Sequence, residues 1–257
     1  MLLATWNVNS LKARFARVSE WIADVQPDVL MLQETKMTDA AFPAGAFAAA
    51  GYESVHFGEG RWNGVAILSR VGLESPRPNF AVGEADFQAR VVSATCGGIV
   101  VVCVYVPNGR SLDDDHYQYK LRFLAQLRDH VAALADPAGD VVIGGDFNIA
   151  PTDADVWDPA ALVGQTHVSA PERDALGRIV EWGVRDVVRD AHPEPGLYSW
   201  WDYRNGSFHR GWGMRIDLLL ASASVAARTT WSAIDRNARK GEQPSDHAPV
   251  LMEVAAR

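Results

Sequence analysis

Carboxylate, amide and imidazole side chains stand at the ends of several apolar segments of this chain. The clearest case is Asp146 and Asn148, which follow the apolar run of residues 141–143 and, being two positions apart, point to the same side of an extended chain. Comparable positions hold Asn7, Glu34, Tyr105, Asp217, Asp246 and His247. Each of these alone is explained by an ordinary turn or cap. Asp217 is the hardest to explain in that way, because a carboxylate between apolar neighbours is costly without a partner, and His247 is the obvious candidate.

The chemistry of these side chains fits one task. Carboxylate and amide oxygens without a cysteine cluster suit a hard cation such as Mg²⁺ or Mn²⁺, and they disfavour structural zinc. An acid paired with a histidine holds the imidazole in one tautomer, and an acid in an Asp-x-Asn turn can take a proton from water. The set therefore predicts metal-assisted hydrolysis of a phosphodiester.

Strands must deliver these side chains to one place. The pattern of apolar and β-branched residues predicts strands at residues 2–6, 29–32, 52–57, 65–69, 89–95, 99–106, 141–145, 197–201, 216–221 and 250–254. The turn at Cys96-Gly97-Gly98 predicts a hairpin between two of them. Gly144 and Gly145 let another backbone or a ligand, such as a phosphate, come close to the strand end.

Two amphipathic helices are predicted between the groups of strands. Apolar residues recur at spacings of three and four over residues 11–25, where Asn9 or Ser10 can cap the start. A second stripe runs over residues 117–134, with Lys120, Arg122, Arg128 and Asp129 off the stripe. Because strands come in groups with long helices between them, the sequence predicts an α+β fold of two packed sheets with helices outside.

The composition is that of an ordinary globular protein. Of 257 residues, 48% are hydrophobic and 22% are charged, with a formal net charge of -8. This charge argues mildly against a simple polycationic nucleic-acid binder, although a carboxylate metal site also adds negative charge. No apolar run approaches the roughly 18 to 20 residues of a membrane span, and no secretory signal is expected. We expect one cytoplasmic domain over residues 1–257, with Cys96 and Cys103 as reduced core residues rather than a disulfide.

Seven short motifs occur in a recognisable order. They are Trp6-Asn7-Val8-Asn9, Leu32-Gln33-Glu34-Thr35-Lys36, Asn63-Gly64-Val65-Ala66-Ile67, Tyr105-Val106-Pro107-Asn108-Gly109, Gly145-Asp146-Phe147-Asn148, Arg215-Ile216-Asp217 and Ser245-Asp246-His247. The sequence thereby resembles the exonuclease III family of apurinic/apyrimidinic endonucleases, within the endonuclease/exonuclease/phosphatase superfamily, over essentially its whole length. The resemblance implies a four-layer α/β/β/α sandwich, in which two mixed sheets face each other and the site lies at one edge.

The resemblance also implies roles for the polar residues. The metal set falls on Asn7, Glu34, Asp146, Asn148, Asp246 and His247, with Glu34 as the principal ligand of Mg²⁺ or Mn²⁺. The catalytic set falls on Tyr105, Asp146, Asn148, Asp217 and His247. Asp146 would activate the attacking water, and Asn148 would position Asp146 and the phosphate. His247, oriented by Asp217, would polarise a phosphate oxygen, and Tyr105 would contact the scissile phosphate or assist the leaving group. The number of metals and the identity of the general base stay open.

The substrate implied by the resemblance is double-stranded DNA with abasic sites or 3′ ends, hydrolysed by a monomer in base excision repair. Trp200, Met214 and Ile216 match an apolar pocket for an extruded abasic sugar, while Asn108 and Arg110 would contact backbone phosphates. The neighbouring triplet at residues 113–115 is a departure, because three aspartates disfavour contact with DNA. The enzyme would be cytoplasmic and associated with the nucleoid when it acts.

Two other interpretations remain. The motifs handle the phosphate and not what it is attached to, so a phosphoesterase of the same superfamily acting on RNA, lipid or inositol phosphates has the same core. A non-catalytic binding protein on this scaffold is the second, and it predicts the loss of at least one ligand. The aromatic residues Trp200, Trp201 and Trp212 are explained either by core packing or by an aromatic wall beside the site.

Overall fold

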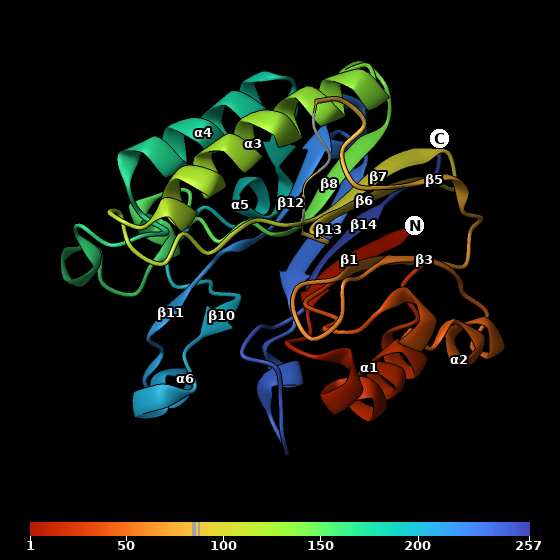
Figure 1. The fold of residues 1–257 in the computed structure, drawn as a ribbon, viewed down its shortest axis with the longest axis horizontal. Helices are drawn as coiled ribbons and strands as arrows, with labels where there is room; N and C mark the ends of the chain where they lie inside the picture. Colours follow the sequence, from red (N-terminus) through yellow and green to blue (C-terminus); the bar gives the residue numbers. More distant parts are fainter. Residues whose placement is uncertain (84–85, 87) are drawn as a thin grey trace.

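Two six-stranded sheets lie at the centre of the protein and pack face to face (Figure 1). The computed structural model describes residues 1–83, 86 and 88–257. The first sheet consists, in spatial order, of β13 (Thr229–Ile234), β14 (Val250–Val254), β1 (Leu2–Asn7), β2 (Val29–Gln33), β4 (Val65–Ser69) and β3 (Glu53–Phe57). The second consists of β5 (Glu74–Pro78), β6 (Val91–Cys96), β7 (Ile99–Tyr105), β8 (Val141–Asp146), β12 (Asp217–Ser222) and β9 (Val184–Asp186). Both sheets are mixed, since β1 pairs parallel with β2, and β7 with β8, among antiparallel pairs.

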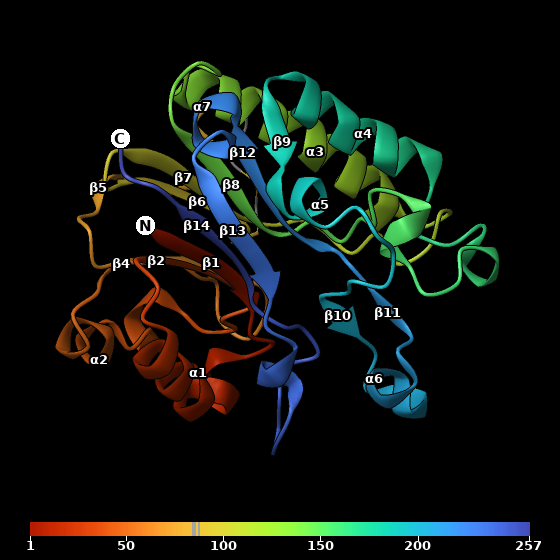
Figure 2. The ribbon, with the colours of Figure 1, turned by 180° about the vertical axis from the view of Figure 1, so that it is seen from behind.

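Helices cover the outer faces of both sheets (Figures 1 and 2). α1 (Leu11–Val25) and α2 (Ala44–Ala49) pack on the first sheet, and α3 (Asp115–Leu134) and α4 (Ala170–Glu181) pack on the second. The connections carry α5 (Val187–Ala191), α6 (Ser207–Arg210), α7 (Ala223–Ala226) and the small ribbon of β10 (Trp200–Trp201) and β11 (Gly213–Met214). This order of layers confirms the predicted α+β sandwich. None of the helices in the described part of the chain has the length and apolarity to cross a membrane.

The core follows directly from the strand sequences. Met31 and Ile67 from the first sheet meet Cys103 and Leu219 from the second in one fully buried cluster. Because β8 has a sheet partner on each edge and apolar layers on both faces, it reads as a continuous apolar run rather than an alternating one. Cys103 is a free thiol, as is the buried Cys96, so the expected absence of a disulfide between them is confirmed.

Most predicted elements are present within two residues of their expected bounds, and the strands at 65–69 and 250–254 match exactly the ranges of β4 and β14. The strand predicted at 197–201 is wrong, because only Trp200–Trp201 pairs, with β11. The strands β5, β9, β11 and β13 were not predicted, nor were the helices α2, α4, α5, α6 and α7. β5 contains two prolines and is exposed along its whole length, so it carries no apolar signal and is tolerated because it lies at a sheet edge.

One further expectation needs correction. Gly144 and Gly145 do not make room for a phosphate: a Cβ on Gly145 would overlap the Val104 carbonyl, and one on Gly144 would lie 2.7 Å from the Met31 sulfur. These glycines are therefore required by strand and sheet packing, with Gly145 at a φ of +156°. Lys120, which lies off the apolar stripe of α3, is completely buried against α4.

A buried histidine makes the stability of the fold depend on pH. His130 on α3 is fully buried, and its Nδ1 accepts a hydrogen bond of 2.8 Å from the Ala81 amide. Burial, with a smaller contribution from Arg77, lowers the pKa of His130 to about 4. The unfolded chain binds this proton more readily than the folded one, so stability is lost as the pH falls from about 6.5 toward 4.

We predict that His130→Gln makes the free energy of unfolding less dependent on pH below neutrality. Between pH 7 and pH 4.5 the free energy of unfolding of the variant should fall by about 2 to 3 kcal/mol less than that of the wild type, because about 1.4 kcal/mol accompanies each pKa unit. Urea unfolding at a series of pH values measures this difference. Parallel pH dependences in the two proteins would show that His130 does not titrate in the unfolding transition.

Candidate active site

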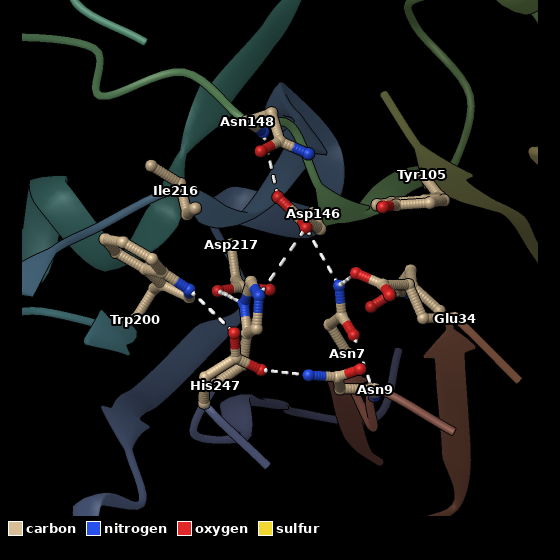
Figure 3. A network of polar contacts seen from close by, with 12 residues as sticks. Asn7, Asn9, Glu34, Tyr105, Asp146, Asn148, Trp200, Ile216, Asp217 and His247 are labelled. Carbon is tan, nitrogen blue, oxygen red and sulfur yellow. Dashed lines mark hydrogen bonds and ion pairs between the residues drawn. The ribbon is translucent and has the colours of Figure 1, made fainter. Parts of the chain in front are cut away.

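The polar residues at the strand ends converge at one end of the sandwich (Figure 3). Asn7 ends β1 and Glu34 follows β2, which is its parallel neighbour. Tyr105 ends β7 and Asp146 ends β8, and these two residues are paired across the parallel strands. Because carboxyl ends of parallel strands meet at the same sheet edge, both sheets deliver their side chains to the same side of the molecule. Antiparallel β12 adds Asp217, directly opposite Asp146.

Asp146 is almost completely buried and is held on both carboxylate oxygens. Its Oδ1 accepts a hydrogen bond of 2.9 Å from the backbone N–H of Asn148, and its Oδ2 accepts one of 2.9 Å from the side-chain Nδ2 of Asn7. Nδ2 of Asn7 also donates to Glu34 Oε1, at 2.9 Å. One amide group therefore joins the two carboxylates, as Figure 3 shows.

His247 is paired as the sequence predicted. Its Nδ1 donates to Asp217 Oδ2 at 2.8 Å, and the Ser199 hydroxyl donates to the same oxygen at 2.7 Å. Its Nε2 faces Asp146 Oδ2 at 3.7 Å. Burial opposes the charged imidazole, but the carboxylates of Asp217 and Asp146 outweigh it and raise the pKa of His247 to about 10. His247 is therefore a cation near neutral pH, with Nε2–H directed toward Asp146.

Burial has the opposite effect on Asp146. It raises the pKa of this carboxyl group to about 7, and the neighbouring charges of Asp217 and Glu34 add to the increase, while His247 opposes it. A carboxylate with a pKa near 7 is a better proton acceptor than an ordinary aspartate. The pKa of Tyr105 is raised well above its ordinary value by burial and by Glu34, so its hydroxyl remains protonated and can donate a hydrogen bond.

The donor set fits a hard divalent cation. Glu34, Asp146 and His247 each present one ligand atom, and these atoms lie within 4.8 Å of one another. The two carboxylates are suitable oxygen ligands, whereas a protonated His247 has no lone pair to offer. Of the other predicted ligands, Asn7 supplies its Nδ2 to both carboxylates and Asn148 is engaged elsewhere, with Nδ2 donating to the Val106 carbonyl at 2.9 Å.

Asp246 lies beside Trp200, at the aromatic part of the cleft. Its Oδ1 accepts from Nδ2 of Asn9 at 2.9 Å, and its Oδ2 accepts from Nε1 of Trp200 at 3.1 Å. Asn9 in turn accepts a hydrogen bond from Lys36 at 2.6 Å, and Lys36 also pairs with Glu34 at 2.8 Å. Asp246 therefore reaches the Glu34 side of the site through a chain of polar contacts.

The carboxylates line a cleft of about 800 Å³. Trp200, Met214 and Ile216 form an apolar part of the lining, as predicted, and Trp200 pairs with Met214 across the β10–β11 ribbon. Trp201 is buried in the core, whereas Trp212 lines the cleft and stacks on Trp157, with the ring centroids 4.9 Å apart. Core packing therefore explains Trp201, whereas Trp200 and Trp212 form the aromatic wall beside the site.

The predicted DNA contacts lie at the rim of the same cleft. Asn108 donates to Oδ1 of Asn148 at 3.2 Å, and the Arg110 side chain is 62% exposed. Asp114 caps α3 by accepting from the His116 amide at 2.8 Å, and it lies 3.8 Å from Arg110. One aspartate of the triplet thus has a structural role and offsets part of the charge of Arg110.

Ser199, Asn9 and His167 are among the residues of the site that were not predicted. Ser199 orients Asp217, Asn9 holds Asp246, and His167 lines the cleft with Nε2 at 3.1 Å from Asn148 Oδ1. Burial, with the charge of Lys120, lowers the pKa of His167 to about 3, so its ring is neutral. Asn9 belongs to the motif Trp6-Asn7-Val8-Asn9. Ser199 and His167 stand alone in loops, outside any motif, so the sequence does not mark them as site residues.

Two sheets, helices outside, and a carboxylate-histidine site at the strand ends define a metal-assisted phosphoesterase. A model of the Endonuclease/Exonuclease/phosphatase family matches residues 4–247, and the chain belongs to this family. Over 268 aligned residues it is 32% identical to exodeoxyribonuclease III of Haemophilus influenzae, covering 98% of this chain and 99% of the relative.

Solved structures show the same fold over the whole chain. A 3′-5′ exonuclease from Neisseria meningitidis is 40% identical, with a TM-score of 0.97. An AP endonuclease from Archaeoglobus fulgidus is 35% identical, with a TM-score of 0.96. Each comparison covers 100% of both chains. The family resemblance found in the sequence motifs is therefore confirmed.

We predict that Asp217→Asn lowers the pKa of His247 from about 10 toward the ordinary value near 6.5, because a carboxylate that stabilises the imidazolium is removed. NMR titration of the histidine rings in the presence of EDTA measures this pKa. Ser199→Ala is the matched control, since it removes the hydroxyl from the same carboxylate but leaves the charge. An unchanged pKa in Asp217→Asn would contradict the assigned pairing.

Proposed function

We propose that this chain is a Mg²⁺-dependent DNA repair nuclease. It hydrolyses the phosphodiester 5′ to abasic sites and removes nucleotides or blocking groups from 3′ ends of double-stranded DNA in base excision repair. The observation that carries the proposal is the placement of Glu34, Asp146 and His247 beside a cleft with an apolar wall. The names of the relatives, an exodeoxyribonuclease III, a 3′-5′ exonuclease and an AP endonuclease, support it.

Glu34 is the principal metal ligand in this proposal, with Asp146 within reach and Asp246 acting through water or directly. A bound divalent cation neutralises charge on the phosphate and on the leaving oxygen. Mg²⁺ is preferred because the ligands are oxygen atoms and the cation keeps several waters. Asn7 has a positioning role, since its amide fixes the separation of the two carboxylates.

Asp146 accepts the proton of the attacking water. Its two oxygens are held by Asn148 and Asn7, so the carboxylate cannot rotate, and its raised pKa makes it an effective base. His247 donates Nε2–H to a phosphate oxygen, where negative charge increases during the reaction, and Asp217 keeps the ring charged and oriented. Tyr105, protonated, supplies a further donor to the phosphate or leaving oxygen.

The cleft supplies the substrate contacts. Trp200, Met214 and Ile216 offer an apolar surface to a sugar without a base, whose extrusion is less costly because stacking is already lost. Asn108 and Arg110 would position the phosphate backbone without reading sequence. We further propose that residues 1–257 act as one catalytic domain, as a monomer in the cytoplasm, where the free thiols Cys96 and Cys103 stay reduced.

Action at 3′ ends without abasic incision is a second candidate. The relative with 40% identity is named as a 3′-5′ exonuclease. In this chain His167 lines the cleft within hydrogen-bonding distance of Asn108 and Asn148, so its ring takes up part of the space beside the phosphate-positioning residues. A chain terminus needs less of this space than a sugar extruded from a continuous strand.

One assay separates these possibilities. We expect purified protein with Mg²⁺ to cleave an abasic duplex, a recessed 3′ end and a 3′-phosphate end, and EDTA to abolish all three activities. Asp146→Asn and His247→Ala should each lower kcat by about 100-fold or more, because each removes a proton acceptor or a charge-stabilising donor. Turnover of 3′ ends alone would select the second candidate. Turnover of RNA, lipid or inositol phosphates but not DNA would refute both, and no turnover of any phosphodiester would favour a binding protein.

We predict that Trp200→Ala lowers kcat/KM on the abasic duplex about tenfold more than on a recessed 3′ end. The apolar face it removes is worth about 1.5 to 3 kcal/mol when fully buried. Trp200→Phe is the matched control, because it keeps an aromatic face and loses only the hydrogen bond to Asp246. If the alanine and phenylalanine variants lower both activities equally, Trp200 acts through Asp246 and not as a pocket wall.

A further inference from the structure

An ion pair without any solvent contact lies beneath the active site. Lys120 on α3 and Glu172 on α4 have side chains that are 0% exposed, with Nζ 2.5 Å from Oε1. Removing two charges from water is costly, and replacing such a pair by apolar residues is often neutral or stabilising. Fold stability alone therefore does not explain why α3 and α4 meet through this pair.

Lys120 is bound to the backbone of two residues at the cleft. Its Nζ donates to the Asn148 carbonyl at 2.6 Å and to the Asn108 carbonyl at 3.4 Å. Asn148 has a φ of 51°, a left-handed conformation that is uncommon for a residue with a side chain. The Lys120 ammonium thus holds the backbone of Asn148 through its carbonyl. In this conformation the backbone N–H of Asn148 points to Asp146.

Glu172 holds the segment that carries His167, whose ring contacts the Asn148 side chain. Its Oε1 lies 2.8 Å from the Thr166 hydroxyl and accepts from the His167 amide at 3.0 Å. Its Oε2 accepts from the Ser169 amide at 3.1 Å and forms the capping box of α4. The Thr166 hydroxyl lies 3.0 Å from the Asn108 carbonyl, so the contacts of Glu172 and Lys120 converge on the same strand-to-helix connection.

We propose that Lys120 and Glu172 are positioning residues of the nuclease, and that their ion pair fixes the backbone of Asn148, Asn108 and His167 for the reaction. The inference rests on the proposed function, because it assigns Asn148 and Asn108 to catalysis and substrate positioning. Neither Lys120 nor Glu172 lines the cleft, so the pair acts only through these backbone contacts.

The titration behaviour of the pair agrees with this geometry. Burial lowers the pKa of Lys120, but the Glu172 carboxylate limits the decrease. Burial would raise the pKa of Glu172, but the Lys120 charge and the hydrogen bonds hold it below its ordinary value. The ion pair thus favours the charged form of each partner against burial, and a charged Lys120 makes charge-assisted contacts to the two carbonyls.

The first test is kinetic. Lys120→Met should lower kcat on a recessed 3′ end by about 100-fold, with KM changed far less, because misplacement of a catalytic group by about 1 Å has this effect. The control is Arg228→Met, which breaks the partly buried pair of Arg228 and Asp140 near the carboxyl terminus, away from the cleft. It should lower the melting temperature and leave kcat within about twofold of the wild type. A fall in kcat of equal size in the control would overturn the proposal.

The second test asks whether Lys120 acts through Asn148. In the double variant Lys120→Met/Asn148→Ala, the fall in kcat should be smaller than the product of the two single falls, because the Asn148 side chain, one of the groups whose position depends on Lys120, is already gone. Multiplication of the two single effects would show that Lys120 acts by another route and would overturn the proposal. If Lys120→Met does not fold, two other variants replace it in the kinetic comparison. Glu172→Gln is isosteric with the wild type, and Lys120→Met/Glu172→Gln removes both charges.

Hydrogen exchange provides a readout that does not require activity. In Lys120→Met or Glu172→Gln, peptides covering residues 106–110, 147–150 and 165–169 should exchange at least about tenfold faster than in the wild type, as expected for local opening. The same peptides should be unchanged in Arg228→Met. Unchanged exchange in the Lys120 and Glu172 variants would overturn the positioning role even in an active enzyme. If the wild-type protein hydrolyses no DNA, the proposed function fails, while this measurement still decides whether the pair fixes the cleft backbone.

Discussion

One side-chain amide joins the two halves of the molecule at the point where chemistry is expected. Asn7 at the end of β1 donates from Nδ2 to Glu34 in its own sheet and to Asp146 in the other, both at 2.9 Å. Two carboxylates this close repel each other, and the amide offsets that repulsion without adding a net charge. The face-to-face packing of the sheets is therefore fixed at the same point as the spacing of the carboxylates, and a shift of one sheet on the other changes the site.

Burial then gives the members of the site different protonation states. The same apolar surroundings that raise the pKa of Asp146 to about 7 also strengthen the attraction between His247 and Asp217, so the pKa of the imidazole rises to about 10. One group becomes a proton acceptor near neutral pH, and the other stays a fixed cation. A base and a cationic donor within 3.7 Å of each other thus arise from one environment, because burial opposes any charge and a specific partner restores it.

Much of this site could be predicted from the sequence, since strand ends, periodicity and motif order are local signals. The supports of the site could not, because they depend on how α3 and α4 pack. Lys120 lies off the apolar stripe of its helix, yet it is completely buried against Glu172 of α4. The sequence does contain one signal for this partner: Ser169 followed three residues later by Glu172 is a capping box, and it marks the start of the α4 helix that was not predicted. His167 has no such signal, since only the loop geometry places it.

The aromatic wall and the acidic site are connected through one hydrogen bond. Trp200 presents its ring to the cleft, while its Nε1 donates to Asp246, which is linked through Asn9 and Lys36 to Glu34. The side chain that faces the cleft therefore also helps to fix Asp246. A change in the position of the Trp200 ring alters the environment of Asp246, so the aromatic wall and the acidic side of the cleft are not independent. Trp157 and Trp212 also line the cleft, but they stack on each other, whereas Trp200 donates to Asp246, so the link between the aromatic wall and the acidic residues runs through Trp200.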